Sequence, residues 1–298
     1  MTGGPRICDY GDSSYREDFW EGQGRDYEDV VERQVLAQLL PERGQRLLEV
    51  GAGFGRISLE YSMYDQVVLL DYSLEQLIYA RQQMGDERFT YVAADAYRMP
   101  FCAGAFDCAT MIRVIHHFED VPAALSQVRT CLCHGGKFIL EYANKRHLKS
   151  MLRYLLGRNN WNPYALEPVE FVELNFNFHP DYIQAEVGQL GFDIRRVAPV
   201  SWLRLGLLKR TLPMSVLSGI DSVLQRTGWR LSPSIFLSLQ LGEALYENTA
   251  AESRHPLDIL RCPRSASPLR RDGDVLISAN GLRWGVVDGV YDFRQPLP

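Results

Sequence analysis

The chain has 298 residues, of which 46% are hydrophobic and 23% charged, and its formal net charge is −5. This length allows one large α/β domain with a small appendage, and the composition is typical of a soluble globular protein. The net negative charge argues against a protein that grips a long polyanion, which normally needs a basic face, so nucleic acid is disfavoured as a partner.

Three features favour a cytoplasmic location. The N-terminal stretch MTGGPRICDYGDSSYRED lacks the basic-then-apolar order of a signal peptide. No uncharged apolar run approaches the roughly 18–20 residues that span a bilayer, so we expect no transmembrane segment. The cysteines are scattered, which argues against a secreted disulfide framework, and we expect them to be reduced. They are Cys8, Cys102, Cys108, Cys131, Cys133 and Cys262.

Helix-like and strand-like segments alternate in the first half, which is the pattern of a sheet wound with crossover helices. The clearest helix covers residues 73–85, because Ser73 is a good cap and Gly85 a good stop. The expected helices cover residues 26–40, 56–63, 73–85 and 121–132. The expected strands cover residues 46–50, 66–73, 89–95, 106–112 and 136–143.

The second half is less regular, and we expect it to contain elements on the substrate side of the domain, at about residues 145–235. Its expected elements are a helix at 148–157, an aromatic segment at 171–180, a helix then a strand at 181–200, helices at 202–212 and 214–228, and a closing strand at 235–241. A polar stretch at 246–256 predicts a boundary near residue 250, so that 1–250 and 251–298 form two domains.

The stretch LLEVGAGFGR at residues 47–56 places three glycines after an apolar strand. A Walker loop needs Gly-Lys-Ser/Thr, but Arg56 follows Gly55. A dinucleotide fingerprint needs a third glycine where Arg56 stands. Asp71 ends the next strand, where an acid accepts ribose hydroxyls in both NAD and S-adenosylmethionine sites. These residues alone leave both ligands open.

The following landmarks separate the two ligands. AADAYRMPF places Asp95 at the end of the third strand, and AFDCATMIRVIHHFED ends a strand near Arg113. The order E-V-G-A-G-F-G, D-Y-S, A-D-A and F-D with H-H resembles class I S-adenosylmethionine-dependent methyltransferases, especially the type 11 group related to quinone-biosynthesis enzymes. The resemblance covers about residues 25–145. It implies a Rossmann-like seven-stranded sheet with helices on both faces and S-adenosylmethionine as cofactor.

The resemblance also implies which residues hold the cofactor. Glu49 and the glycine backbone would face the methionine portion, Asp71 would bind the ribose, and Tyr72 would pack against the adenine. Asp95 and Ala96 would cover the adenine edge. The implied cofactor-binding set is Glu49, Gly51, Ala52, Gly53, Gly55, Asp71, Tyr72, Asp95, Ala96 and Arg113.

His117 is the candidate catalytic residue, because it lies just beyond the fourth strand, at the edge where open α/β sheets bind ligands. A base is needed when the acceptor must lose a proton, and histidine suits pH 7. The alternative, that His116 and His117 cap the turn or pack under the cofactor, stays open at this point.

Two short segments are candidates for contacts with the methyl acceptor. Asn144, Lys145 and Arg146 follow the fifth strand and would orient the acceptor, unless they form a solvated loop. Arg25 and Tyr27 lie in the N-terminal segment, which closes over the cofactor in similar enzymes. The N/D-P-P-Y/F motif of amine methyltransferases is missing after the fourth strand, which favours an oxygen or carbon acceptor. The apolar and basic stretch WLRLGLLKRTL is either a membrane-surface helix or a pocket lid, and both indicate an acceptor with an apolar part.

The C-terminal segments PLDILRCPRSASPL and LISANGLRWGVVDGVYDF resemble the small zinc-ribbon domain of Trm112-like proteins, which activate several methyltransferases in trans. Cys262 stands at the first ligand position, but Ser265 replaces the second thiolate, and neither residues 277–278 nor Asn280 supply the other pair. One thiolate cannot form a tetrahedral zinc site. We therefore expect a metal-free tail that contacts the catalytic domain of the same chain. CLCHGG at residues 131–136 also lacks a fourth ligand and is expected to be structural.

The leading hypothesis is therefore a methyltransferase that acts on a small or lipid-like metabolite. A methyltransferase of tRNA or of a translation factor is an alternative, suggested by the Trm112-like tail, and a basic groove beside residues 144–146 would favour it. The third alternative is a non-catalytic scaffold that retains cofactor binding, against which the intact glycine and acidic positions argue.

Overall fold

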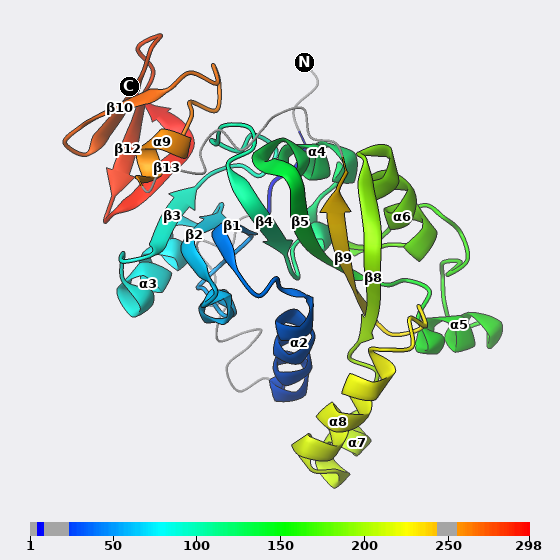
Figure 1. Ribbon diagram of the computed structural model, residues 1–298. Coiled ribbons are helices and arrows are strands. Elements are labelled where there is room, and N and C mark those ends of the chain that lie inside the picture. The colour runs from blue at the N-terminus through cyan, green and yellow to red at the C-terminus, as the bar shows by residue number, and fades with distance from the viewer. Residues whose placement is uncertain (1–4, 9–23, 243–254) are drawn as a thin grey trace.

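Figure 1 shows a computed structural model, which describes residues 5–8, 24–242 and 255–298. The domain boundary expected near residue 250 lies outside these ranges. The helices are α2 (Asp26–Leu39), η1 (Ser58–Tyr61), α3 (Leu74–Met84), η2 (Ile115–His117), α4 (Val121–Cys131), α5 (Leu148–Leu155), α6 (Pro180–Gln189), α7 (Gly206–Thr211), α8 (Met214–Leu224) and α9 (Pro256–Ile259), with η1 and η2 of the 3₁₀ type. No helix in these ranges is long and apolar enough to cross a membrane.

Most strands belong to one sheet, in which the described residues form eleven strands in the order β10-β11-β12-β13-β3-β2-β1-β4-β5-β9-β8. The first five along the chain are β1 (Gly44–Val50), β2 (Tyr64–Asp71), β3 (Phe89–Ala93), β4 (Phe106–Met111) and β5 (Leu132–Ala143). The others of this sheet are β8 (Phe192–Val200), β9 (Ser234–Leu241), β10 (Leu269–Asp272), β11 (Val275–Ser278), β12 (Arg283–Val287) and β13 (Val290–Leu297). A separate hairpin pairs β6 (Val169–Val172) with β7 (Asn175–Asn177).

The strands β1 to β5 pair in parallel, and β9 runs antiparallel to both β5 and β8. The carboxyl ends of β1, β2, β3, β4, β5 and β8 therefore lie at one edge of the sheet. Helices cover both of its faces, since two separate hydrophobic cores contain residues of α2, α3 and α8 on one side and of α4 and α6 on the other. This is the Rossmann-like architecture that the sequence predicts.

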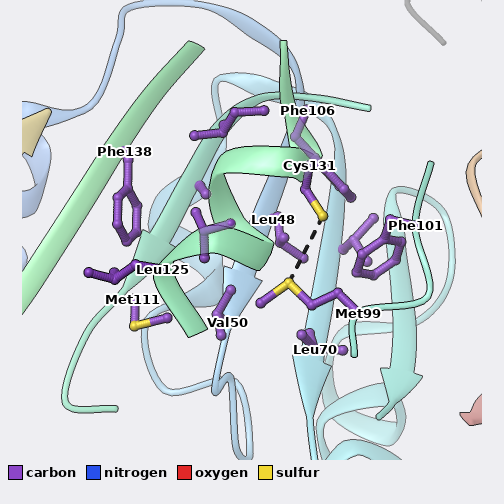
Figure 2. Close-up of a cluster of buried hydrophobic side chains, with 14 of the residues drawn as sticks. Leu48, Val50, Leu70, Met99, Phe101, Phe106, Met111, Leu125, Cys131 and Phe138 are labelled. Atoms are coloured by element: carbon purple, nitrogen blue, oxygen red, sulfur yellow. Dashed lines mark hydrogen bonds between the residues drawn. The ribbon is translucent and has the colours of Figure 1, made fainter. Parts of the chain in front are cut away.

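Figure 2 shows the core under α4, where Leu125 and Cys131 face Leu48 and Leu70 of the central strands. The Cys131 Sγ lies 4.0 Å from the Met99 sulfur. Burial raises the pKa of the Cys131 thiol well above its ordinary value. Cys131 is therefore a packing residue of this core.

The C-terminal residues extend the main sheet instead of forming a sheet of their own. Strand β13 pairs in parallel with β3, with Tyr291 opposite Val92. Two backbone bonds of 2.8 Å, from Cys102 to Ile259 and from Arg261 to Pro100, join the segment before β10 to the main domain. The buried Leu260, Leu276 and Trp284 belong to the same core as α4. The seven-stranded sheet that we expected thus has four more strands, because the edge of β3 offers unpaired backbone groups to β13.

One expected helix is much shorter in the structure. Residues 56–63 contain only the 3₁₀ turn η1, because the Ser58 and Tyr61 side chains turn inward and donate hydrogen bonds to the buried Glu49. The strand β2 then begins at Tyr64, which leaves no room for a further turn.

Candidate functional site

Two adjoining pockets lie where β1, β2, β3 and β4 end. The larger pocket is lined by Arg6, Ile7, Cys8, Val50, Gly51, Gly53, Leu70, Asp71, Tyr72, Gln76, Ala94, Asp95, Ala96, Tyr97, Arg113, Val114, His117 and Phe118. The smaller is lined by Glu49, Gly51, Ala52, Gly53, Phe54, Arg56, Ile57, Ile112 and Arg113. Because Gly51, Gly53 and Arg113 line both, the two pockets meet at the glycine turn. Nine of the ten residues expected to hold the cofactor line one or both pockets, and Gly55 lines neither.

The glycines of the turn have different tasks. Gly51, Gly53 and Gly55 all have positive φ, a conformation that favours glycine. A Cβ on Gly51 would lie 2.2 Å from the Val114 side chain, and one on Gly55 would lie 2.5 Å from Met84. A Cβ on Gly53 would meet no atom of the described residues within 4 Å. Packing thus requires Gly51 and Gly55 to be small, whereas at Gly53 the free space belongs to the pockets.

Asp71 connects this turn with the end of β2. Its Oδ2 accepts a hydrogen bond from the Gly53 amide at 2.7 Å, and its Oδ1 accepts one from the Ser73 amide at 2.9 Å. The carboxylate is therefore oriented by backbone groups while it lines the larger pocket. A carboxylate in this position can accept hydrogen bonds from two neighbouring hydroxyls of a ribose.

Glu49 is a buried acid at the smaller pocket. Burial raises its pKa to about 7, although hydrogen bonds from Ser58 and Tyr61 work in the opposite direction. The Tyr61 hydroxyl also lies 2.9 Å from the Thr110 hydroxyl, which helps to hold the group in place. A carboxyl group with this pKa ionises readily when a cation is placed beside it.

Arg113 lines both pockets, but its guanidinium is held by an acid of α2. Its Nε donates to Glu32 at 2.8 Å, and Arg56 donates to the other oxygen of Glu32 at 2.9 Å. Burial opposes ionisation of Glu32, but Arg113 and Arg56 outweigh it and lower its pKa. The backbone amide of Arg113, which has a φ of 61°, donates to Glu141 at 2.9 Å. This ion-pair group fastens α2 over the glycine turn.

Sequence reasoning missed Glu32 and Glu141. The signal for Glu32 is an acid among the apolar positions Val31, Val35 and Leu36 of an amphipathic helix, where it is fully buried. A buried acid needs a cationic partner. Its partners are too far away in the sequence to be identified without the structure.

His117 stands at the end of η2 and lines the larger pocket. Its Nδ1 lies 2.8 Å from the Leu174 carbonyl oxygen. A carbonyl only accepts, so we assign the proton to Nδ1, which leaves the lone pair on Nε2. Burial lowers the pKa of His117, so the ring is neutral at pH 7. His116, with a ring centroid 4.0 Å away, is half-buried and lines neither pocket.

The residues expected to contact the acceptor line neither pocket, and three of them have clear structural tasks. Tyr27 is buried under α8 and donates to Asp221. The Asn144 amide donates to the carbonyls of Arg230 and Ser232, and the Lys145 ammonium donates to the carbonyl of Glu167. These three side chains thus have hydrogen-bond partners within the protein, and their contact with the acceptor stays a prediction.

Arg25 and Arg146, which were expected beside them, are half-buried at the start of α2 and after β5. Three residues that sequence reasoning missed, Arg6, Ile7 and Cys8, line the larger pocket instead. The Arg6 guanidinium lies 3.2 Å from both Glu119 and Glu170. Nothing in the sequence indicates these ion pairs, because Arg6, Glu119 and Glu170 lie far apart in the chain.

Known proteins resemble the part of the chain that carries the pockets. The family model described as "Methyltransferase domain" matches residues 48–140. The O-methyltransferase cnsE of Penicillium expansum is 31% identical over 118 residues, which cover 38% of this chain and 43% of that protein. The ubiquinone/menaquinone biosynthesis C-methyltransferase UbiE of Dinoroseobacter shibae is 31% identical over 117 residues, covering 37% and 47%. The chain spans less than half the length of these two relatives.

Solved structures resemble a larger share of the chain. A possible histamine N-methyltransferase of Thermotoga maritima has a TM-score of 0.56 at 17% identity and covers 78% of this chain and 97% of that one. A complex of the Haloferax volcanii Trm112 methyltransferase activator with a putative methyltransferase has a TM-score of 0.55 at 14% identity, covering 80% and 100%. These likenesses show the fold. The family match adds that residues 48–140, which carry the glycine turn and Asp71, resemble a methyltransferase domain.

Proposed function

We propose that the protein is a methyltransferase that binds S-adenosylmethionine in the two adjoining pockets and methylates oxygen or carbon of a small or lipid-like metabolite. The observation that carries the proposal is the open space at Gly53, where the two pockets meet, beside the backbone-oriented carboxylate of Asp71. The pocket with Asp71, Tyr72, Asp95 and Ala96 suits the nucleoside. The pocket with Glu49 suits the cationic amino-acid part.

The cofactor supplies a methyl group that is already activated as part of a sulfonium. The protein then has to exclude water and to hold the acceptor in line with that methyl group. An oxygen or an acidic carbon must also lose a proton, and we assign the acceptance of this proton to His117, which lines the larger pocket and is neutral at pH 7. The names of the relatives, an O- and a C-methyltransferase, are consistent with this acceptor chemistry.

The proposal extends to residues 255–298, which we assign as a metal-free Trm112-like domain. Ser265, at the expected second ligand position, lies 2.9 Å from the Ser267 hydroxyl and 3.5 Å from the Asn280 Oδ1. Ser278 donates to the same oxygen at 2.6 Å. Hydrogen bonds thus link the positions where zinc ligands would stand. Stoichiometric zinc in the purified protein, measured by atomic emission, would contradict this assignment.

Calorimetry with S-adenosylmethionine tests the cofactor site. Asp71→Ala removes up to two charge-assisted hydrogen bonds to the ribose, each worth roughly 1.5–3 kcal/mol, so the affinity falls by at least about tenfold. Asp65→Ala is the matched control, because Asp65 is an exposed acid at the opposite end of the same strand. Unchanged affinity in Asp71→Ala, or tighter binding of NAD than of S-adenosylmethionine, would refute the proposal.

A further inference from the structure

Two helices of the domain each expose an apolar stripe. In α5, Leu148, Leu152 and Leu155 follow the i, i+4, i+7 spacing of one helix face, and all three are exposed, with Leu155 at 73%. The buried residue of α5 is Ser150. A helix that packs by a serine and presents leucines to the outside is inverted relative to an ordinary surface helix.

The helix α8 also exposes an apolar stripe. Val216, Ile220 and Val223 have the same spacing and are exposed, with Val223 at 66%, whereas the buried residues of this helix are Leu217, Ser218 and Asp221. Two stripes of this kind form a larger apolar surface than an isolated exposed leucine would.

The two helices lie at the same end of the molecule, toward the lower right of Figure 1. The Leu148 amide at the start of α5 donates to the carbonyl of Leu231, which follows α8, at 2.9 Å. Helix α5 follows the carboxyl end of β5, and α7 and α8 follow that of β8, which runs parallel to β5. The stripes therefore border the sheet edge that carries the candidate cofactor pockets.

Positive charge is concentrated beside these stripes. Residues 142–166 contain five basic residues and no acid, and residues 201–232 contain five basic residues and one acid, in a chain whose net charge is −5. That acid, Asp221, is buried and bound by Tyr27. Exposed basic side chains that form no ion pair with any described residue are Lys149, Arg153, Arg158, Arg210 and Arg226.

We propose that this α5–α8 surface, made of the two apolar stripes and these five basic side chains, docks the protein on an anionic lipid membrane. Exposed aliphatic side chains flanked by Lys and Arg match an interface in which acyl chains lie beneath negative headgroups. A second copy fits less well, because a two-fold contact of this surface with itself would bring like charges together. A nucleic acid would match the charges but leave the leucines and valines without a partner.

Docking would place the pocket edge at the membrane, which deepens the proposed function: the acceptor would be a lipid-phase metabolite taken from the bilayer. This statement about the acceptor rests on the proposed methyltransferase activity. The docking itself does not, because it requires only the exposed surface.

Sedimentation of the full chain with vesicles tests the docking. We expect binding to phosphatidylcholine vesicles that contain phosphatidylglycerol, weaker binding to phosphatidylcholine alone, and weakening by salt. Leu152→Ser/Leu155→Ser and Lys149→Gln/Arg153→Gln should each reduce the bound fraction by about tenfold or more. The control is Leu59→Ser, because Leu59 is 63% exposed but lies on η1 and belongs to neither stripe.

Several results would overturn the docking proposal. They are no binding to anionic vesicles, binding that the leucine variant leaves unchanged, a dimer that the leucine variant dissolves, or a melting temperature that falls in that variant because the stripe packs against this chain. Retained binding of tRNA by the leucine variant, without vesicle binding, would assign the basic residues to nucleic acid instead. Calorimetry with S-adenosylmethionine on the same variants separates the two proposals. A protein that does not bind S-adenosylmethionine would contradict only the proposed methyltransferase, and a protein that does not bind vesicles would contradict only the docking of the α5–α8 surface.

Discussion

Replacing Gly53 by alanine would separate the structural use of the glycine turn from its use in binding. Gly53 has a φ of +54°, lines both pockets and leaves open space where a Cβ would stand. Its amide can still donate to Asp71 in the variant, because alanine keeps the N–H. We therefore expect Gly53→Ala to fold and to lose affinity for S-adenosylmethionine.

The size of both effects follows from the geometry. An alanine at positive φ costs about 1–2 kcal/mol of backbone strain, and no clash adds to it at this position. In a domain of this size, that loss lowers the melting temperature by about 2–8 °C. The added methyl group occupies space that the ligand needs, so we expect at least about a tenfold loss of affinity, or about 1.4 kcal/mol.

Two further glycine variants make this test specific. Gly191 has a φ of +78° and lies in open space after α6, so Gly191→Ala should lower the melting temperature by a similar amount and leave the affinity for S-adenosylmethionine unchanged. Gly51→Ala should lose more stability, by about 1–3 kcal/mol beyond the strain, because its Cβ would overlap Val114. The assays are thermal melting and calorimetry. Wild-type affinity in Gly53→Ala would show that the ligand does not approach the turn and would refute the reasoning.

Three other predictions concern protonation, catalysis and the tail. The pKa of Glu49 is raised to about 7 in the native state, so its contribution to stability is present at acidic pH and lost as the pH rises through about 7. A cationic cofactor favours the ionised form, so its affinity should rise over the same interval in wild type and stay flat in Glu49→Gln, as calorimetry across pH would show. An acceptor can be found by transfer of a labelled methyl group. With that acceptor, His117→Ala should keep its affinity for the cofactor and lower turnover by about a hundredfold or more. Full turnover in this variant would show that His117 has only a structural role. Deleting residues 251–298 should expose the edge of β3 and part of the core under α4, lowering the free energy of unfolding by at least about 2 kcal/mol; a truncated protein that melts and stays soluble like the full chain would contradict this.

Local signals were sufficient for most elements of the main domain. The helix α3 begins after Ser73, whose side chain accepts from the Gln76 amide, and it stops at Gly85, as the sequence predicts. The helix expected at 56–63 is wrong because the buried Glu49, which lies outside this segment in the sequence, accepts a hydrogen bond from Ser58 and draws that side chain inward. Apolar periodicity does not reveal such a competing partner.

The candidate site likewise contains some residues whose position could be predicted from the sequence and others whose contacts could not. Residues at the ends of parallel strands share one edge, so Asp71 and Asp95 could be placed together from the order of the strands alone. The hydrogen bonds of Tyr27, Asn144 and Lys145 could not be predicted, because their partners come from distant loops and from α8. A polar residue near a strand end is a candidate for binding only until the structure shows whether a loop already uses it.

The tail, which we propose to be metal-free, needs another source of stability. Structural zinc contributes on the order of 10–16 kcal/mol to such modules, and some forty residues bury too little surface to replace it alone. Here Trp284 and Leu276 lie in the core of the main domain, and β13 gains backbone partners on β3. Burial opposes ionisation of the remaining Cys262 thiol, but the side chain of Ser265 and neighbouring amides outweigh it and lower its pKa, so the loop still orients polar groups toward that position. In the metal-free tail that we propose, pairing with the sheet edge would take over the stabilising task of the metal, and β13 also covers the edge of β3.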